Sequence, residues 1–441
     1  MIIEFSVGNY ASFKDPVTLS LVAARSIKSR NRVLDAENLI PVDAELSLLV
    51  STVVYGPNAG GKSNLIKASA FMCDFVRTSF RELPAGAAIN VQPFRLSTQT
   101  VGGPSTFEMV FLIEGRQFRY GFSVNSQKVE REWLFMIPKT KEIALFEREG
   151  QAIRPNPSNA HAREFRAILS LLGRINSQEP LRSNALFLSV AAQNNGALAR
   201  QVTDWFTNLR FMSGLDDLGY RGFTIQQFKD VEQQARINDL VHRLDVGIDL
   251  IEMVPIDRDE ALKGAPGPLR ELFERMGKSE TVSFRSHHQV YDEQGKPIQS
   301  TTFDLLQNES DGTQKLFFMA GPILDALANG RVLWVDEMEA RLHPNLTGAL
   351  VGLFNSRASN PKRAQLIFTT HDTNLLDLRK MRRDQIWFID KDKTAASRLY
   401  SLVEFKIRND NSSLEDDYIH GIYGATPHLG ELAAAFDQDD A

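Results

Sequence analysis

The sequence has a single cysteine, Cys73, among its 441 residues. One thiol excludes an internal disulfide and every zinc site built on two or more cysteines, and it is typical of a reducing compartment. The chain also has little excess charge of either sign, since 50 basic and 55 acidic residues leave a formal net charge of −5. A strong overall attraction to nucleic acid or anionic lipid is therefore excluded, whereas a local basic patch is not.

Long uninterrupted hydrophobic runs are missing too. The most apolar stretch, 316–335, contains Asp325, Asn329 and Arg331, so it does not predict a membrane span. Glu4 lies where the apolar core of a secretory signal would begin, and we expect a cytoplasmic protein with no membrane association. The chain instead has 43% hydrophobic and 24% charged residues. Its length corresponds to roughly two to three domains, which is typical of a globular protein with a large core.

Periodic apolar segments in the first two thirds of the chain predict mostly strands. Alternating runs at 3–7 and 17–21 predict an opening β-hairpin, and a continuous apolar run at 48–55 predicts a buried strand of a parallel sheet. A further alternating region at 107–132 predicts more strands, and 226–244 predicts one helix with an apolar face.

Loops and a change of pattern follow. The segments 148–164 and 257–280 are rich in turn residues and predict a surface loop and a mobile connection, and two strands are predicted on either side of the turn at 293–295. The last third alternates helices and strands, at 315–327, 332–335, 344–356 and 365–368. This alternation predicts α/β architecture.

A glycine-rich turn follows the predicted strand 48–55 and satisfies the phosphate-loop pattern G-x-x-x-x-G-K-[ST]. Small residues let consecutive backbone N–H groups surround a β-phosphate, while Lys62 reaches the β- and γ-phosphate oxygens and Ser63 ligates Mg²⁺. The helix that follows adds an anion site at its N-terminus. The alternative, an idle glycine turn, does not explain this context. The predicted nucleotide-binding residues are Gly56, Pro57, Asn58, Ala59, Gly60, Gly61, Lys62, Ser63 and Asn64.

Two acidic residues, Asp336 and Glu337, end the predicted strand 332–335. Beside a phosphate loop, Asp336 is expected to hold Mg²⁺, and Glu337 to accept a proton from the attacking water. Two solvated acids at a strand end are the simpler alternative. His371 follows the next predicted strand, where a histidine can reach the γ-phosphate, although a lone histidine is more often a packing or surface residue.

A second phosphate-binding segment is predicted before the helix 315–327. Ser310, Gly312 and Thr313 offer hydroxyl and backbone N–H groups at a helix N-terminus. Taken alone, these residues fit an ordinary N-cap better.

The order of these four motifs resembles the layout of ABC/SMC-type ATPases. The sequence looks most like the stand-alone AAA/ABC-type ATPases of bacterial phage-defence operons, the AbiL and RloA-like group. The resemblance extends over nearly the whole chain and includes Met1–Lys14, Leu186–Ser189, Leu342–Pro344 and Gly421–Pro427. It implies an α/β ATPase head with a phosphate-loop sheet core, an N-terminal antiparallel β subdomain and a compact inserted helical lobe.

The resemblance also implies cofactors and partners. In that family the signature of one subunit closes over ATP bound to the phosphate loop of another, which implies a homodimer or a higher oligomer with ATP and Mg²⁺ in composite sites. By the same resemblance Gln193 senses Mg²⁺ and the attacking water, with a polar loop residue as the alternative. The implied partner is a separate effector, a TOPRIM-type nuclease or a toxin, and a nucleic-acid partner stays open. The runner-up function is that of a DNA-binding, SMC-like repair or genome-maintenance ATPase.

The expected division is 1–200 and 301–441 for the two parts of the head and 201–300 for the insertion lobe. The 250 residues from Lys62 to Gly312 (312 − 62 = 250) are too poorly patterned for a long coiled-coil arm. Three weaker candidates have simpler interpretations. A TOPRIM-like pair at Asp390 and Asp392 fits a hairpin turn, a metal site at His287–His288 fits an exposed strand, and a nucleic-acid contact at Arg379–Arg383 fits a solvated basic face.

Overall fold

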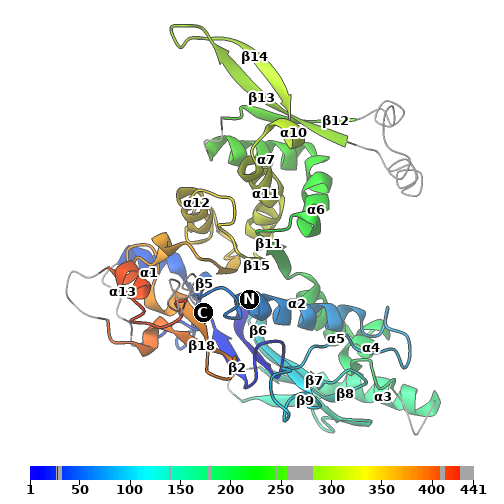
Figure 1. Cartoon of the computed structure of the whole chain (residues 1–441). Helices are drawn as coiled ribbons and strands as arrows, with labels where there is room; N and C mark the ends of the chain where they lie inside the picture. The colour runs from blue at the N-terminus through cyan, green and yellow to red at the C-terminus, as the bar shows by residue number, and fades with distance from the viewer. Residues whose placement is uncertain are drawn as a thin grey trace, which may run out of the picture. The chain divides into compact units, whose positions relative to one another are not determined.

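The computed structural model describes residues 1–25, 27, 32–138, 141–175, 181–244, 247–255, 282–407 and 413–427. The chain forms two compact units, and Figure 1 labels many of their elements. Unit 1 comprises Met1–Ser213, Ala326–Glu339 and Thr347–Ala441, and unit 2 comprises Gly214–Asp325 and Ala340–Leu346. The division of the sequence at residues 200 and 300 stays a prediction, and the segment 257–280 lies outside the described residues.

A six-stranded sheet in unit 1 has the order β11-β15-β16-β5-β17-β18. Its first five strands are parallel: β11 (Arg210–Ser213), β15 (Val332–Asp336), β16 (Gln365–Thr369), β5 (Ser51–Tyr55) and β17 (Ile386–Lys391). The last strand, β18 (Ser397–Ser401), is antiparallel to β17. Because the carboxyl ends of parallel strands meet at one edge, the residues that follow β5, β15 and β16 are brought together there.

The apolar run 48–55 forms two strands, where the sequence predicted one. β4 (Ser47–Leu49) pairs antiparallel with β3 (Leu39–Pro41), and β5 then joins the parallel sheet. Between them the Val50 N–H donates to the Asn38 carbonyl (3.1 Å), while the Val50 carbonyl accepts from Leu366 of β16 (2.9 Å). Hydrophobicity is continuous across this change of partner, so it gave no sign of the break.

The second large sheet of unit 1 is antiparallel, with the order β10-β9-β8-β7-β6-β1-β2. The predicted hairpin is confirmed as β1 (Ile2–Gly8) and β2 (Val17–Ser20), and the predicted strands over 107–132 as β6 (Ser105–Ile113), β7 (Arg116–Val124) and β8 (Val129–Ile137). The predicted surface loop 148–164 is wrong in part. β9 (Ile143–Glu149) and β10 (Ala152–Pro155) pair there through a turn at Gly150, followed by the 3-10 turn η1 (Ala160–Ala162).

Helix α2 (Lys62–Thr78) packs against β15 of the parallel sheet and against β1 and β6 of the antiparallel sheet. Phe75 of α2 contacts Phe122 of β7, with 5.4 Å between the ring centroids. The two sheets and α2 therefore share one hydrophobic core. The other helical segments are α1 (Arg32–Asn38), α3 (Arg163–Ile175), α4 (Phe187–Gln193), α5 (Ala197–Thr207), α12 (Pro344–Phe354), α13 (Leu414–Ile419), and the 3-10 turns η2 (Thr373–Leu375), η3 (Arg383–Gln385) and η4 (Leu402–Glu404).

A fully buried ion pair joins the antiparallel sheet to α4. Glu132 and Arg148 lie 3.4 Å apart with no exposed side-chain surface. The Glu132 carboxylate also accepts from the backbone N–H groups of Phe187 (2.7 Å) and Leu188 (2.9 Å) and from the Tyr120 hydroxyl (3.0 Å). A buried charge needs such partners, and here they fix the N-terminus of α4.

Unit 2 contains α6 (Leu218–Phe228), α7 (Val231–Arg243) and a three-stranded sheet of β12 (Leu250–Pro255), β13 (Val282–Tyr291) and β14 (Pro297–Asp304). The helix predicted over 226–244 begins five residues late, because α6 ends at Phe228 and Asp230 caps the start of α7. Its carboxylate accepts from the N–H groups of Glu232 and Gln233 (both 3.0 Å). The hairpin predicted around 293–295 is confirmed by the antiparallel pairing of β13 and β14.

The long helix α11 (Asp311–Asn329) contains Pro322 and follows the short helix α10 (Leu305–Asn308). A proline within a helix has no N–H for the carbonyl four residues before it. In unit 2 that carbonyl, of Phe318, instead accepts a hydrogen bond from the Thr224 hydroxyl of α6. A side chain at Gly321 would place its Cβ 2.5 Å from the same hydroxyl, so α6 and α11 approach closely at this turn.

Candidate nucleotide-binding site

The loop from Gly56 to Gly61 joins β5 to α2 and depends on glycine at two points. Gly61 has φ +120°, and a Cβ there would lie 2.4 Å from Ser397 Oγ. A Cβ at Gly56 would lie 2.3 Å from the Ile389 carbonyl oxygen. The loop therefore follows its path only with glycine at these positions.

Two serines far apart in the sequence hold the loop. The Ser397 hydroxyl, on β18, donates to the Gly60 carbonyl (2.6 Å) and lies 2.8 Å from Ser12 Oγ. Ser12 Oγ in turn accepts from Asn64 Nδ2 (2.8 Å). Neither serine has a role predicted from the sequence, although Ser12 lies within the segment 1–14 that carries the family resemblance.

The residues of the loop fit a phosphate group. Gly61 precedes α2 without a capping side chain, and the first turn of α2 contains no acidic residue. Lys62 is 4% exposed, and its ammonium group donates to the carbonyls of Gly56 (2.8 Å) and Pro57 (3.2 Å). Burial lowers the pKa of Lys62, while the carboxylates of Glu337, Glu339 and Asp336 act in the opposite direction. A buried cation beside an uncapped helix N-terminus is a favourable place for an anion.

The two acids at the end of β15 are held by one hydroxyl of β16. Thr369 Oγ1 donates to Asp336 Oδ1 (2.7 Å) and accepts from the Glu337 backbone N–H (2.8 Å). Glu337 has φ +51°, in the left-handed region that is unfavourable for a residue with a Cβ. Strain of this kind is frequent at functional sites, and here the backbone turns sharply at the end of the strand.

A third acid, Glu339, lies next to His371. Glu339 Oε1 accepts from the His371 backbone N–H (2.6 Å), and the buried Oε2 has no hydrogen-bond partner among the described residues. Burial lowers the pKa of His371 and the charge of Lys62 lowers it further, while Glu339, Glu337 and Asp336 raise it. Five ionisable groups therefore interact at one place. They are Lys62, Asp336, Glu337, Glu339 and His371, and the sequence predicted this proximity for all of them except Glu339.

The structure does not bring Gln193 to the phosphate loop. Ser189, one turn earlier in α4, donates to the Val76 carbonyl (2.6 Å) and lies 3.2 Å from Ser79 Oγ. Both partners are at the C-terminal end of α2, whereas the loop precedes Lys62. Since α2 has 17 residues, its two ends are about 25 Å apart. The sensor role of Gln193 stays a prediction, and this geometry gives it no support.

The predicted signature lies in unit 2 and has the geometry of a helix cap. The Thr313 N–H donates to Ser310 Oγ (3.2 Å), and the two side-chain oxygens are 2.9 Å apart. A Cβ at Gly312 would lie 2.6 Å from the Arg341 carbonyl oxygen, and Arg341 pairs with Asp311 (3.3 Å). The segment after β15 is thus packed against the start of α11, and the role of Ser310 toward another subunit stays a prediction.

The weaker candidates have structural explanations. Asp392 Oδ1 accepts from the N–H groups of Thr394 (2.7 Å) and Ala396 (3.1 Å), as expected for a hairpin turn. His287 and His288 contact Glu252 (3.3 Å) and Glu309 (2.7 Å) respectively. Within the described residues no group of three His, Cys, Asp or Glu side chains could hold a metal ion.

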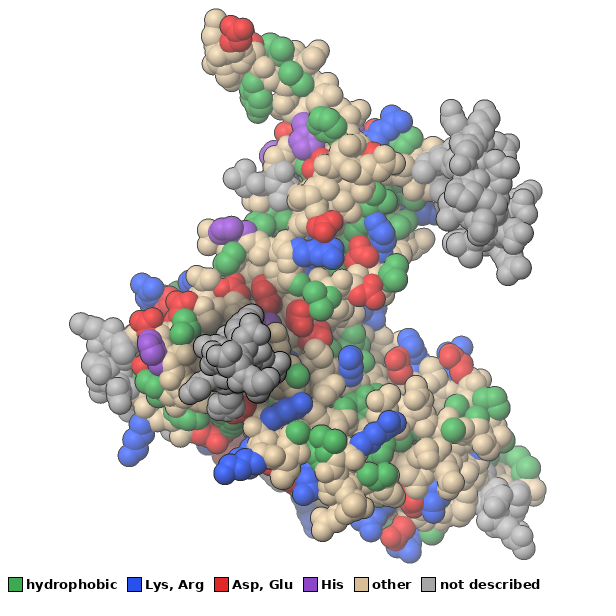
Figure 2. All heavy atoms as spheres, viewed as in Figure 1, with side chains coloured by type: hydrophobic (Ala, Val, Ile, Leu, Met, Phe, Trp, Pro, Cys, Tyr) green, Lys and Arg blue, Asp and Glu red, His purple; other side chains and the backbone are tan. Residues whose placement is uncertain are grey.

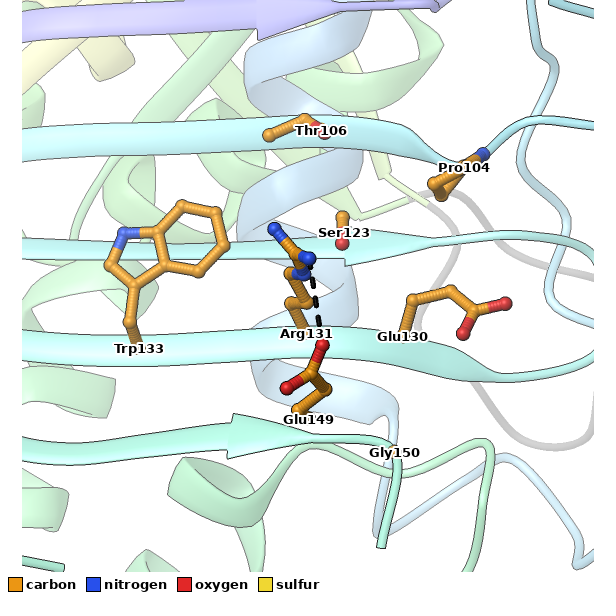
Figure 3. A pocket seen from close by; sticks show the side chains of 8 residues that line it. All are labelled: Pro104, Thr106, Ser123, Glu130, Arg131, Trp133, Glu149 and Gly150. Carbon is orange, nitrogen blue, oxygen red and sulfur yellow. Dashed lines mark hydrogen bonds and ion pairs between the residues drawn. The ribbon is translucent and has the colours of Figure 1, made fainter. Parts of the chain in front are cut away.

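A separate hollow of about 540 Å³ lies on the outer face of the antiparallel sheet (Figure 3). Its lining includes Thr106, Ser123, Trp133 and Arg131, which pairs with Glu149 at 3.5 Å. Thr106 and Ser123 alternate along their strands with the buried Phe107 and Phe122, so the hollow is on the opposite face from α2. It is not part of the phosphate-loop site.

Fold and site together define an ATPase of the phosphate-loop class. The chain belongs to the family described as "AAA domain, putative AbiEii toxin, Type IV TA system", whose model matches residues 51–377. This agrees with the AAA-type, abortive-infection-related group that the sequence resembled. No curated protein matches the chain.

Two solved structures are among those similar to the chain. An SMC head domain from Thermotoga maritima has a TM-score of 0.37 and 11% sequence identity, covering 92% of this chain and 99% of its own. The Smc head domain with an extended coiled coil, bound to the C-terminal domain of ScpA and derived from Pyrococcus furiosus, has a TM-score of 0.35 and 10% identity, covering 96% and 99%. Neither likeness is close enough to carry an argument about this chain. No helix within the described residues is both long and apolar enough to cross a membrane.

Proposed function

We propose that this protein binds and hydrolyses ATP with Mg²⁺ and uses the nucleotide to switch a homodimer that controls a separate effector in bacterial anti-phage defence. The observation that carries the ATPase part is the position of Lys62. Its buried ammonium group lies in the loop before α2 and interacts electrostatically with Asp336, Glu337, Glu339 and His371.

Different residues of the chain would bind the phosphates, hold Mg²⁺ and accept the proton. Lys62 and the N–H groups of the loop would hold the β- and γ-phosphates, and Ser63 with Asp336 would hold Mg²⁺. Bound ATP supplies the phosphoanhydride that is cleaved. Glu337 is the residue we assign as acceptor of the proton from water, and the neutral form of His371, favoured by its lowered pKa, is available to contact the γ-phosphate.

The rate at which the Lys62→Ala variant releases phosphate from ATP tests the assignment of the phosphate loop. The variant lacks the cation that offsets phosphate charge, so ATP binding and turnover should both be lost. Lys67→Ala is the matched control, because Lys67 is an exposed lysine of the same helix. Turnover near the wild-type rate in a folded Lys62→Ala protein would refute the phosphate-loop assignment.

A composite site requires that Ser310 acts on nucleotide bound to another subunit. Ser310→Asp keeps a good N-cap residue but brings a negative charge toward the phosphate, whereas Ser310→Thr keeps both the cap and the hydroxyl. Ser310→Asp and Lys62→Ala should each be inactive alone. After random mixing they should recover about a quarter of the wild-type rate, since half of the dimers would have one intact site. Heterodimers without recovered activity would place Ser310 outside the site.

The effector is proposed to be another chain, a TOPRIM-type nuclease or a toxin, held or released according to the bound nucleotide. The description of the matched family, which names a toxin and a type IV toxin–antitoxin system, supports a role in such two-component systems. Cells that express the protein alone and together with the product of its neighbouring gene should be challenged with phage. Full protection by the lone protein would refute a separate effector, and hydrolysis stimulated by DNA would favour the runner-up function in genome maintenance.

A further inference from the structure

Strand β14 (Pro297–Asp304) is the last strand of the three-stranded sheet in unit 2. One side of it pairs with β13, and no described strand pairs with the other side. Six of its eight residues are exposed, on both faces of the sheet. Figure 1 shows the β13–β14 hairpin projecting beyond α6, α7 and α11 of the same unit. The strand therefore presents unpaired backbone groups together with two uncovered faces.

This edge lacks the usual protection against pairing. Exposed edge strands normally carry charged residues, above all lysine, that prevent contact with another chain. From Pro297 to Phe303 the sequence is Pro-Ile-Gln-Ser-Thr-Thr-Phe, with no charge. Instead it exposes apolar surface at Ile298 (59%) and Phe303 (43%), and Tyr291 of β13 is also exposed (58%). Figure 2 shows hydrophobic side chains on the surface of this hairpin, at the top of the view. Beyond His287, where β12 no longer pairs with β13, the hairpin has only two strands, and such a ribbon is marginally stable in water by itself.

We propose that β14 pairs antiparallel with β14 of a second copy of this chain, so that two three-stranded sheets join into one of six strands. An edge without charge can meet its own copy with no repulsion, whereas a charged partner would find nothing on it to pair with. Around a two-fold axis perpendicular to the sheet, Ser300 faces Ser300 of the second copy. This register overlaps the whole uncharged segment 297–303, leaves Asp304 outside, and brings Ile298 opposite Thr302.

The association does not depend on nucleotide. β14 belongs to unit 2 and contains none of the phosphate-loop residues, so Lys62→Ala should form these dimers as wild type does. This separates the proposed contact from a composite ATP site, which closes only with nucleotide bound. The two proposals can therefore fail independently.

Cross-linking through an introduced cysteine tests the register. Residues that face each other in antiparallel strands have Cα atoms about 4.5–5.5 Å apart, within the range that a disulfide spans. The natural Cys73 is buried and does not interfere. Ser300→Cys should give a covalent dimer under mild oxidation without ATP. Gln294→Cys, exposed at the hairpin turn, is the control and should not.

Sedimentation without nucleotide tests the association itself. Wild-type protein should be dimeric at micromolar concentration, and Ser300→Lys should be monomeric because two lysines would face each other across the axis. Gln294→Lys should remain dimeric, and all three proteins should bind ATP equally, which shows that they are folded. A monomeric wild-type protein, or equal cross-linking of both cysteine variants, would overturn the proposal. So would a wild-type chain that associates only when a different protein is added.

Discussion

Thr369 donates a hydrogen bond from its hydroxyl group to Oδ1 of Asp336, with 2.7 Å between the two oxygens. Thr369 Oγ1 also accepts a hydrogen bond from the backbone N–H of Glu337. One side chain at the end of β16 therefore orients both acids at the end of β15. Side chains that hydrogen-bond to a metal ligand contribute substantially to metal affinity, so Thr369 is expected to position Asp336, the proposed Mg²⁺ ligand.

Thr369→Val should weaken Mg²⁺ binding without removing any ligand. The variant keeps the shape of threonine but leaves Asp336 without its hydrogen bond, and about 10- to 100-fold in metal affinity is typical for such a loss. Thr369→Ser keeps the hydroxyl and should restore the affinity. The measurement is the Mg²⁺ concentration that gives half-maximal hydrolysis. An equal loss in both variants would point to packing and not to the hydroxyl.

Glu337→Gln should separate binding from turnover. It preserves shape and leaves Asp336 in place but removes the proton acceptor, so ATP should bind while hydrolysis falls by about 10²–10⁴-fold. Glu339→Gln is the comparison, since a glutamine oxygen can still accept from the His371 N–H. Rapid hydrolysis by Glu337→Gln together with inactive Glu339→Gln would transfer the role of base to Glu339.

His371 should couple nucleotide binding to pH. Its folded-state pKa is lowered by burial and by Lys62. The negative charge of bound ATP should raise the pKa of His371. ATP binding is therefore accompanied by uptake of a proton at pH values between the pKa of His371 without ATP and its pKa with ATP. Affinity for a non-hydrolysable ATP analogue should therefore rise as the pH falls from about 7.5 to about 6. His371→Gln should show a smaller rise, and identical slopes in the two proteins would contradict this.

Gly61→Ala should damage both stability and binding. Alanine is strained at φ +120°, and its Cβ would collide with Ser397 Oγ. We expect a loss of about 1–3 kcal/mol in the free energy of unfolding, measured by denaturant titration. Ala59→Gly is the opposite change in the same loop, because Ala59 has φ +61° and glycine adopts positive φ without steric strain. A greater loss in Ala59→Gly would contradict the backbone argument.

Thr224→Val should destabilise the protein. The Phe318 carbonyl, which has no N–H partner at Pro322, would lose its hydrogen bond from Thr224. Valine has about the same side-chain volume as threonine, so the expected cost is that of a buried acceptor without a partner, about 1–3 kcal/mol. Calorimetry of the double variant Thr224→Val, Pro322→Ala is the control. Alanine restores an N–H to the helix, so the cost of the valine should be smaller in that background, and an equal cost would exclude this explanation.

The sequence predicted the residues of the site whose chemistry is local. Lys62, Asp336, Glu337 and His371 each follow a strand, and parallel strands bring their ends together, so motif and pattern were sufficient to predict that these residues lie close to one another. Their roles toward nucleotide stay predictions. Thr369 lies only two residues before His371, yet its contact with Asp336 spans 33 residues and depends on the neighbouring positions of β15 and β16 in the sheet.

Residues whose importance is purely tertiary could not be predicted. Ser12 and Ser397 meet across 385 positions of the chain, and nothing in either local sequence indicates the other. Gln193 is the opposite case, because its role was predicted from local sequence and its tertiary position gives that role no support. Its local sequence matched a family pattern, but Ser189 fixes α4 at the far end of α2.

The order of the strands also matters while the chain is being made. β5 pairs on one side with β16 and on the other with β17, both more than 300 residues later. At ribosomal speeds this interval takes about 15–60 s, during which an apolar strand has no sheet to join. The hairpins of the antiparallel sheet pair over short distances and can fold meanwhile. The candidate nucleotide-binding site is therefore among the last parts of the nascent protein to assemble, and a truncated product that ends before β16 would lack it.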